Sequence, residues 1–180
     1  MALTATIYTF EVALSDVDRG VYESLTFKAA QHPSETDEFL IARVLAYCLE
    51  YREGIAFSRG LADPDEPPIT VRDLTGAMQV WVDIGNPDAA RLHKASKSTP
   101  RVVIYTHKDP ARLVRQMDSE RIHRREAIEI RALDPGLIDE LVRRLDRRMK
   151  LDLSVTDGHL YVTIGGETLE GTNTLVRSDG

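Results

Sequence analysis

The sequence predicts one α/β domain over residues 1–180, built on a mixed β-sheet flanked by helices. Apolar runs typical of strands alternate with amphipathic helical segments between residues 78 and 148. Alternating segments that flank turn residues predict a hairpin near each end of the chain. No internal repeat and no long linker divides the sequence, and a chain of this length can bury a core as one domain.

The first half of the chain predicts a hairpin, a helix and a short strand. Residues 3–14 alternate, which predicts a strand with both faces at least partly covered, and Val21–Lys28 alternates again as its partner. A helix of about 17 residues is expected next, with Ser34 as its N-cap. Ile55–Arg59 predicts a short strand, whereas residues 63–68 are acidic and too rich in proline for regular structure.

The second half repeats a strand–helix order. Met78–Ile84 predicts a buried strand that carries Asp83 near its end, followed by a turn at Gly85 and a helix over 87–97. The further expected elements are strands at 101–106 and 126–131, helices at 109–118 and 135–148, a hairpin at 151–156 and 160–164, and a short strand or frayed tail from about residue 171.

Composition excludes several classes of protein. The single cysteine, Cys48, rules out an internal disulfide framework and fits a reducing compartment. No signal peptide is indicated and no apolar run is long enough for a membrane helix, so we expect a cytoplasmic protein with no membrane partner. The net charge of −6 argues against a protein that coats nucleic acid nonspecifically.

The usual motifs of several enzyme classes are also absent from the sequence. It contains no glycine-rich phosphate loop, no histidine and cysteine spacing suited to zinc, and no G-x-S-x-G nucleophile turn. Any more specific hypothesis therefore depends on acidic and basic side chains around residues 73–94.

Asp83 is the most distinctive of these side chains, because it lies inside an apolar run. A carboxylate there must be at a strand end or be paired, since burying it alone is costly. One interpretation is an ion pair with Arg91 or Lys94, and the other is a catalytic role. Arg91, Lys94 and Ser98 share one face of the expected helix, which could contact phosphate or simply face water.

Several segments together resemble the bacterial YaeQ family. They are MALTATIY, HPSE (32–35), FSRGL (57–61), DEP (65–67), DLTG (73–76), WVDIGNPD (81–88) and R-L-x-K-A (91–95). The family is similar in fold to PD-(D/E)XK nucleases, whose core is a helix, a small β-meander, a helix and a further strand. The resemblance therefore implies a PD-(D/E)XK nuclease-like core, here with extra N- and C-terminal hairpins.

The resemblance also implies a set of site residues. Glu35 matches the acid of the first helix, Asp73 is the candidate for the first strand aspartate, and Asp83 matches the second acid. Gly85 stands where the motif has lysine, so Lys94 would have to reach back from the next helix. The expected substrate contacts are Ser34, Arg59, Arg91 and Lys97.

Two functions follow as hypotheses. In the first, Asp73 and Asp83 bind Mg²⁺ or Mn²⁺, Glu35 completes the site, and Lys94 assists hydrolysis of a phosphodiester in DNA or RNA. In the second, the chain is not an enzyme. The acids and Lys94 form a buried structural ion-pair network, and the protein binds another protein or a nucleic acid in gene expression.

Overall fold

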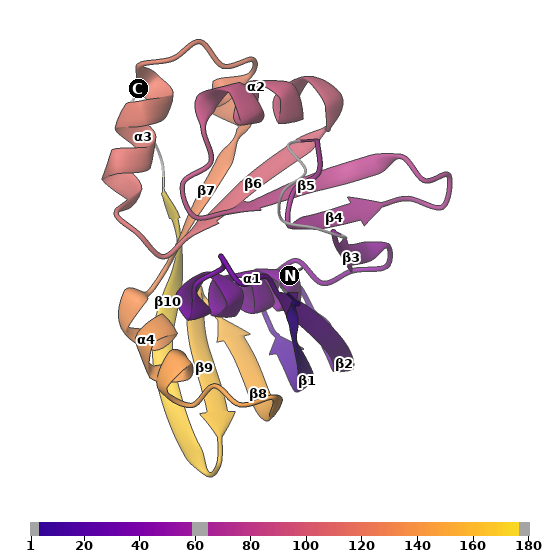
Figure 1. Ribbon diagram of the computed structural model, residues 1–180, viewed down its shortest axis with the longest axis vertical. Helices are drawn as coiled ribbons and strands as arrows, with labels where there is room; N and C mark the ends of the chain where they lie inside the picture. The colour runs from indigo at the N-terminus through magenta and orange to yellow at the C-terminus, as the bar shows by residue number, and fades with distance from the viewer. Residues whose placement is uncertain (1–3, 59–64, 177–180) are drawn as a thin grey trace. The chain divides into compact units, whose positions relative to one another are not determined.

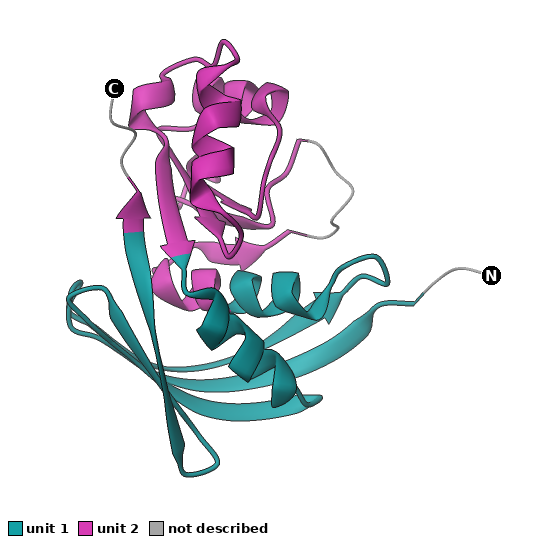
Figure 2. Ribbon diagram, turned by 90° about the vertical axis from the view of Figure 1, so that its left-hand side faces the viewer, with its two compact units in different colours: residues 1–44, 133–174 teal, residues 45–132, 175–180 magenta. Residues whose placement is uncertain are grey.

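The structure is a computed structural model that describes residues 4–58 and 65–176. Within these residues it has four α-helices and ten strands (Figure 1), so the predicted α/β fold with a mixed sheet and helices is confirmed at that level. The chain forms two units, residues 1–44 with 133–174 (unit 1) and residues 45–132 with 175–180 (unit 2), coloured separately in Figure 2. The expectation of one domain over residues 1–180 stays a prediction.

Unit 1 contains a five-stranded sheet in the order β2-β1-β8-β9-β10. Strand β1 runs parallel to β8, and the other neighbouring pairs are antiparallel. The strand bounds are Thr6–Asp16 (β1), Val21–Gln31 (β2), Arg148–Thr156 (β8), His159–Ile164 (β9) and Glu167–Val176 (β10), whose last two residues belong to unit 2.

One face of this sheet carries the core of unit 1. Helix α4 (Pro135–Arg143) packs against β10 at Gly171, where an added Cβ would lie 2.7 Å from the Leu137 Cβ, so only glycine fits. The alternate residues of β1, such as Glu11 and Ala13, are exposed, and the strand does not have the two covered faces that its sequence predicted. Polar side chains dominate this uncovered face.

Helix α1 (Asp37–Leu49) passes from unit 1 into unit 2 after Val44. It begins later than expected, because the hydroxyl of Thr36 accepts a hydrogen bond from the N–H of Phe39 at 3.1 Å. Thr36 is therefore the helix cap, and the expectation that Ser34 caps it is wrong.

Unit 2 contains a second run of five strands in the order β7-β6-β5-β4-β3. Strands β3, β4 and β5 form an antiparallel meander, while β5, β6 and β7 are parallel. The bounds are Ile55–Phe57 (β3), Ile69–Arg72 (β4), Met78–Ile84 (β5), Arg101–Thr106 (β6) and Glu129–Leu133 (β7), with helices Ala89–Ser98 (α2) and Pro110–Asp118 (α3).

Helices α2 and α3 cover one face of these strands with an apolar core that includes Trp81, Leu92, Ile104 and Leu113. On the opposite face, Tyr105 donates its hydroxyl to Glu50, the residue that follows α1, at 2.7 Å. Successive residues of β6 thus contact different layers, as the alternation of a strand requires. Among the described residues, no helix is long and apolar enough to cross a membrane.

The element boundaries differ from expectation in the last third of the chain. Helix α4 ends at Arg143 rather than at residue 148, because the following residues lead into β8, where Met149 is buried. Strand β10 is longer than the short segment expected, and β4 was not expected at all. A strand of four residues between a proline-rich stretch and a turn is too short for periodicity to reveal.

Candidate functional site at the carboxyl end of strand β5

The strand, turn and helix at residues 78–98 form as the sequence predicted. Gly85 follows β5 with φ of +80°, a conformation that suits glycine, and its N–H donates to the carbonyl of Tyr105 at 2.8 Å. The carboxylate of Asp88 accepts the N–H of Arg91 at 2.8 Å and caps α2. The turn therefore directs α2 back across the end of β5.

Asp83 is buried at this end, and one of its two carboxylate oxygens accepts two hydrogen bonds. Its Oδ2 accepts hydrogen bonds from the indole Nε1 of Trp81 at 2.8 Å and from Nε of Arg91 at 2.9 Å. Only 5% of the Asp83 side chain is exposed, and 21% of that of Arg91. Asp83 is thus ion-paired in the structure, and its partner is Arg91 rather than Lys94.

Arg91 also connects Asp83 to the residues that precede β4. Its second guanidinium nitrogen donates to the backbone carbonyl of Glu66 at 2.8 Å, and its guanidinium carbon lies 5.3 Å from the ring centroid of Trp81. Lys94, one helical turn later, forms an ion pair with Asp65. Both members of that pair are more than half exposed, so its contribution to stability is small.

Asp73 lies at the other end of β5, and the expected metal pair of Asp73 and Asp83 does not form. Arg72 is paired with Met78, at the start of β5, whereas Asp83 comes five residues later, roughly 16 Å along a strand. Mg²⁺ holds oxygen ligands at about 2.1 Å, so no single ion could contact both carboxylates. The Asp73 carboxylate instead accepts the N–H groups of Thr75 and Ala77 at 2.9 and 3.0 Å.

We expect Asp73→Ala to lower the melting temperature, because Asp73 holds the β4–β5 turn together. The hydrogen bond from the Thr75 hydroxyl, and others from Ala77 and Gln79, lower the pKa of Asp73. A carboxyl whose pKa is lowered in the folded state stabilises above its ordinary pKa, and this contribution is lost as pH falls. Melting curves should therefore show a smaller effect of the substitution in acid than at pH 7. An equal loss of melting temperature at both pH values would contradict this role. Glu120→Ala, at an exposed position after α3, is the control.

The acid expected from the first helix belongs to unit 1 and precedes α1. Glu35 is buried and accepts both Nε and Nη2 of Arg43 at 3.0 Å. Burial raises the pKa of Glu35, and the charge of Arg43 and its hydrogen bonds oppose this. Ser34 is exposed and its hydroxyl lies 2.7 Å from Nδ1 of His32. Of the other expected contacts, Lys97 is exposed on α2, and Arg59 lies outside the described residues.

Asp65 and Glu66 are the site residues that sequence reasoning missed. They precede β4, whose first residue Ile69 is paired with Val82, the neighbour of Asp83. The signal was the short segment ITVR at residues 69–72, which would have identified the acids before it as neighbours of the end of β5. Only residues 63–68 were expected to be irregular, and residues 69–72 were assigned to no element.

The carboxylates at this end do not form a ready site for a divalent cation. Asp83 holds the guanidinium of Arg91, and Asp65 holds the ammonium of Lys94. A dication would have to compete with both cations. In the described part of the chain, no group of three or more histidine, cysteine, aspartate or glutamate side chains is arranged to hold a metal.

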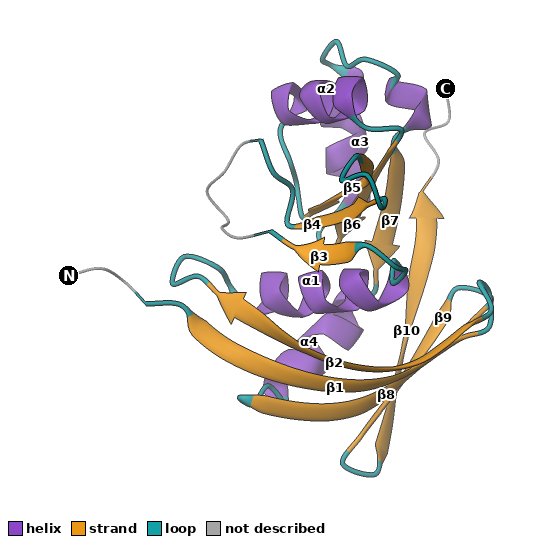
Figure 3. Cartoon of the chain, turned by 90° about the vertical axis from the view of Figure 1, so that its right-hand side faces the viewer, coloured by secondary structure: helices purple, strands orange, loops and turns teal. Residues whose placement is uncertain are grey.

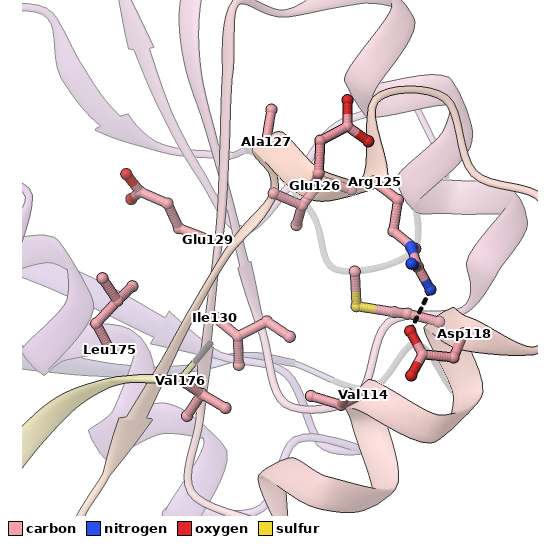
Figure 4. A pocket seen from close by; sticks show the side chains of 11 residues that line it. Val114, Asp118, Arg125, Glu126, Ala127, Glu129, Ile130, Leu175 and Val176 are labelled. Atoms are coloured by element: carbon pink, nitrogen blue, oxygen red, sulfur yellow. Dashed lines mark hydrogen bonds and ion pairs between the residues drawn. The ribbon is translucent and has the colours of Figure 1, made fainter. Parts of the chain in front are cut away.

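Unit 2 also contains a pocket of about 470 Å³ that shares no residue with this site (Figure 4). It lies between α3, β7 and the end of β10. Apolar side chains such as Val114, Ile130 and Val176 line it, and the ion pair of Arg125 with Asp118 stands at one side. None of the residues expected from the sequence to act in catalysis or binding lines this pocket.

Comparison with known proteins identifies the family. The model of the YaeQ protein family matches residues 1–173. The chain belongs to the YaeQ family. It is 30% identical over 171 residues to the YaeQ proteins of Salmonella typhi and Escherichia coli, covering 94% of each chain. Crystal structures of YaeQ proteins from Pseudomonas syringae and Xanthomonas axonopodis pv. citri match with a TM-score of 0.87 each, at 32% and 31% identity.

The YaeQ structures cover 97% of this chain, and 97% and 99% of their own chains, so the fold described above is that of the family. The segment WVDIGNPD, which helped to indicate YaeQ from the sequence, forms the end of β5, the Gly85 turn and the cap of α2. The segment DLTG forms the β4–β5 turn at the opposite end of β5, where the Asp73 carboxylate accepts the N–H of Thr75.

Proposed function

We propose that this member of the YaeQ family binds nucleic acid without cutting it. The observation that carries this proposal is the ion pair of Asp83 with Arg91, since a guanidinium occupies the position near the carboxylate that a metal ion would need. Along the chain, α1 is followed by the β3–β5 meander, α2 and the parallel strand β6, and this order supports descent from a PD-(D/E)XK nuclease-like fold. In this proposal the fold is kept and the chemistry is lost.

Exposed cations beside α2 supply the binding surface. Lys97 lies on α2, and Arg121 and Arg124 lie on the segment after α3, all exposed. Two side chains of α2 hold that segment at His123: its N–H donates to Nδ1 of His93 at 2.9 Å, and its carbonyl accepts the Ser96 hydroxyl. Arg124 has φ of +49°, an unfavourable conformation outside glycine. The contacts thus fix a strained, basic loop on the outer side of α2.

The binding surface is tested by reversing its charge. Fluorescence anisotropy with labelled single- and double-stranded DNA and RNA should show binding that weakens with salt. Arg121→Glu combined with Arg124→Glu should weaken it at least about tenfold and reduce the slope against log salt by about 2. Arg148→Glu with Lys150→Glu makes the same charge change on exposed residues of unit 1 and should have less effect. The proposal would be contradicted if both double variants weakened binding equally, or if the wild-type protein bound no nucleic acid.

Metal-dependent hydrolysis is the second candidate, and one observation favours it. Asp65, Asp83 and Lys94 all belong to the carboxyl end of β5, with Asp65 in place of Asp73 as the first acid. The sequence reads Pro64-Asp65 just before β4, where the PD-(D/E)XK pattern has its proline and first aspartate. In this candidate Mg²⁺ or Mn²⁺ would have to displace Arg91 and Lys94 from the two carboxylates.

The variant Asp83→Ala separates the two candidates. If Asp83 is structural, its loss leaves Arg91 and the buried Trp81 N–H without their acceptor and lowers the free energy of unfolding by about 2 kcal/mol. Removing an acid from a working catalytic site more often raises stability. Calorimetric titration with MgCl₂ and MnCl₂ and a nuclease assay on DNA and RNA complete the test. Saturable metal binding and cleavage, both lost in Asp83→Ala, would establish the hydrolase and overturn our proposal.

A further inference from the structure

Strand β2 is a long edge of the unit 1 sheet. Its eleven residues, Val21–Gln31, pair in continuous register with β1, from Asp16 opposite Val21 to Thr6 opposite Gln31. It stands last in the strand order, so its other side has no strand beside it in the described structure (Figure 3). An edge strand leaves alternate backbone N–H and C=O groups without strand partners.

This edge lacks most features that keep proteins from pairing through such strands. Natural edges are short, bulged, interrupted by proline or rich in charge. Strand β2 has no proline, its register with β1 has no bulge, and its only charged residues are Glu23 and Lys28. At one end the carbonyl of Ala30 accepts Nη2 of Arg43 at 2.8 Å. The contact considered below therefore uses the stretch from Val21 to Lys28.

The residues of this stretch are complementary to a second copy of themselves. An antiparallel pair with its two-fold axis at Leu25 places residues whose numbers sum to 50 opposite each other, on the same face of the sheet. Lys28 then faces Tyr22 of the second copy, a cation beside an aromatic ring that is 62% exposed in one chain. Glu23 faces Phe27, so no like charges lie opposite each other.

We propose that two copies of this chain associate through β2, so that their unit 1 sheets join into one continuous sheet across a two-fold axis. The interface is isologous, because each copy contributes the same strand. Backbone hydrogen bonds supply the attraction, and the pair of Lys28 with Tyr22 selects the register. Pairing removes the exposed edge from both copies at once, so the assembly closes at two chains.

The test is the mass of the protein in solution. Sedimentation equilibrium and light scattering over a wide range of concentrations should give a mass of two chains at the upper end. Ser24→Lys with Thr26→Lys adds two cations on the exposed side of β2 and places them opposite each other across the axis. We expect this variant to raise the dissociation constant at least about tenfold. Thermal melting checks that it still folds.

A matched control places the same charges on the neighbouring interior strand. Ala13→Lys with Ser15→Lys changes exposed residues of β1 on the same face, and should leave the dissociation constant nearly unchanged. A monomer at every concentration would overturn the proposal. So would a dimer that both double variants weaken equally, or an assembly that grows beyond two chains.

Discussion

Arg43→Met is expected to lower the free energy of unfolding by about 4 kcal/mol, the largest effect of any single change considered for this protein. The substitution keeps the apolar volume but leaves Glu35, whose side chain is only 1% exposed, without its cation and without two hydrogen bonds. A buried unpaired carboxylate is destabilising by several kcal/mol. Urea denaturation followed by circular dichroism measures the loss.

The pH dependence gives this prediction a second readout. Burial raises the pKa of Glu35 even with Arg43 present, and removing the cation raises it further. A carboxyl whose folded pKa is raised binds its proton more tightly when folded, so stability falls as pH rises through the window between the unfolded and folded pKa. The deficit of Arg43→Met should thus be smaller near pH 4 than at pH 7.

A double variant controls for the loss of packing. Arg43→Met combined with Glu35→Leu removes both charges and should recover most of the lost stability, because well-packed apolar residues often replace a buried ion pair at little cost. If the double variant is as unstable as Arg43→Met alone, the unpaired carboxylate is not the cause. The interaction energy from this cycle measures the coupling between the two side chains.

Glu50→Ala is expected to cost about 3 kcal/mol, the second largest effect. Glu50 is buried and accepts Nη1 and Nη2 of Arg101 at 2.6 and 3.1 Å, besides the hydroxyl of Tyr105. Burial raises the pKa of Tyr105 well above its ordinary value, so its hydroxyl stays protonated and donates. Arg101 keeps a bond to Glu129 at 2.6 Å after the substitution, which limits the loss.

For Glu50 the dependence on pH has the opposite sign to that of Glu35. Burial alone would raise the pKa of Glu50, but the hydrogen bonds and charge of Arg101 outweigh it, and the pKa is lowered. The stabilisation is therefore present above the ordinary carboxyl pKa and is lost as pH falls through the folded pKa. The difference in the free energy of unfolding between wild type and Glu50→Ala should therefore become smaller in acid. Glu53→Ala, at an exposed position nearby, should change neither curve.

The strands of unit 2 were predictable where the sequence repeats one pattern over enough residues. Met78–Ile84 and Arg101–Thr106 form strands with the predicted bounds, because apolar β-branched and aromatic residues dominate both segments. Asp88 and Asp109 cap α2 and α3, since carboxylates accept the first free N–H groups, and both helices begin after these residues rather than at the expected positions 87 and 109. Of the strands of unit 2, only β4 was not predicted, because four residues are too few to show the alternation of a strand.

The site was predictable in part. Asp83 was correctly singled out as a carboxylate needing a partner, and Arg91 was one of two candidates. Helical spacing could not choose between Arg91 and Lys94, which share a face of α2. The choice depends on the path of the chain through Gly85, which brings Arg91 to Asp83 and Lys94 to Asp65. The separation of Asp73 from Asp83 could not be predicted, because it depends on the direction of β4 relative to β5, and β4 was not recognised in the sequence.

The backbone conformation at Gly85 disfavours a lysine two residues after Asp83. The position two residues after Asp83, where a (D/E)-x-K motif needs lysine, has φ of +80°. Any L side chain in that left-handed conformation costs roughly 1–2 kcal/mol. A single mutation of Gly85 to lysine would therefore destabilise the protein through its backbone conformation alone. A lysine could stand at this position without that cost only if the turn between β5 and α2 took another backbone conformation.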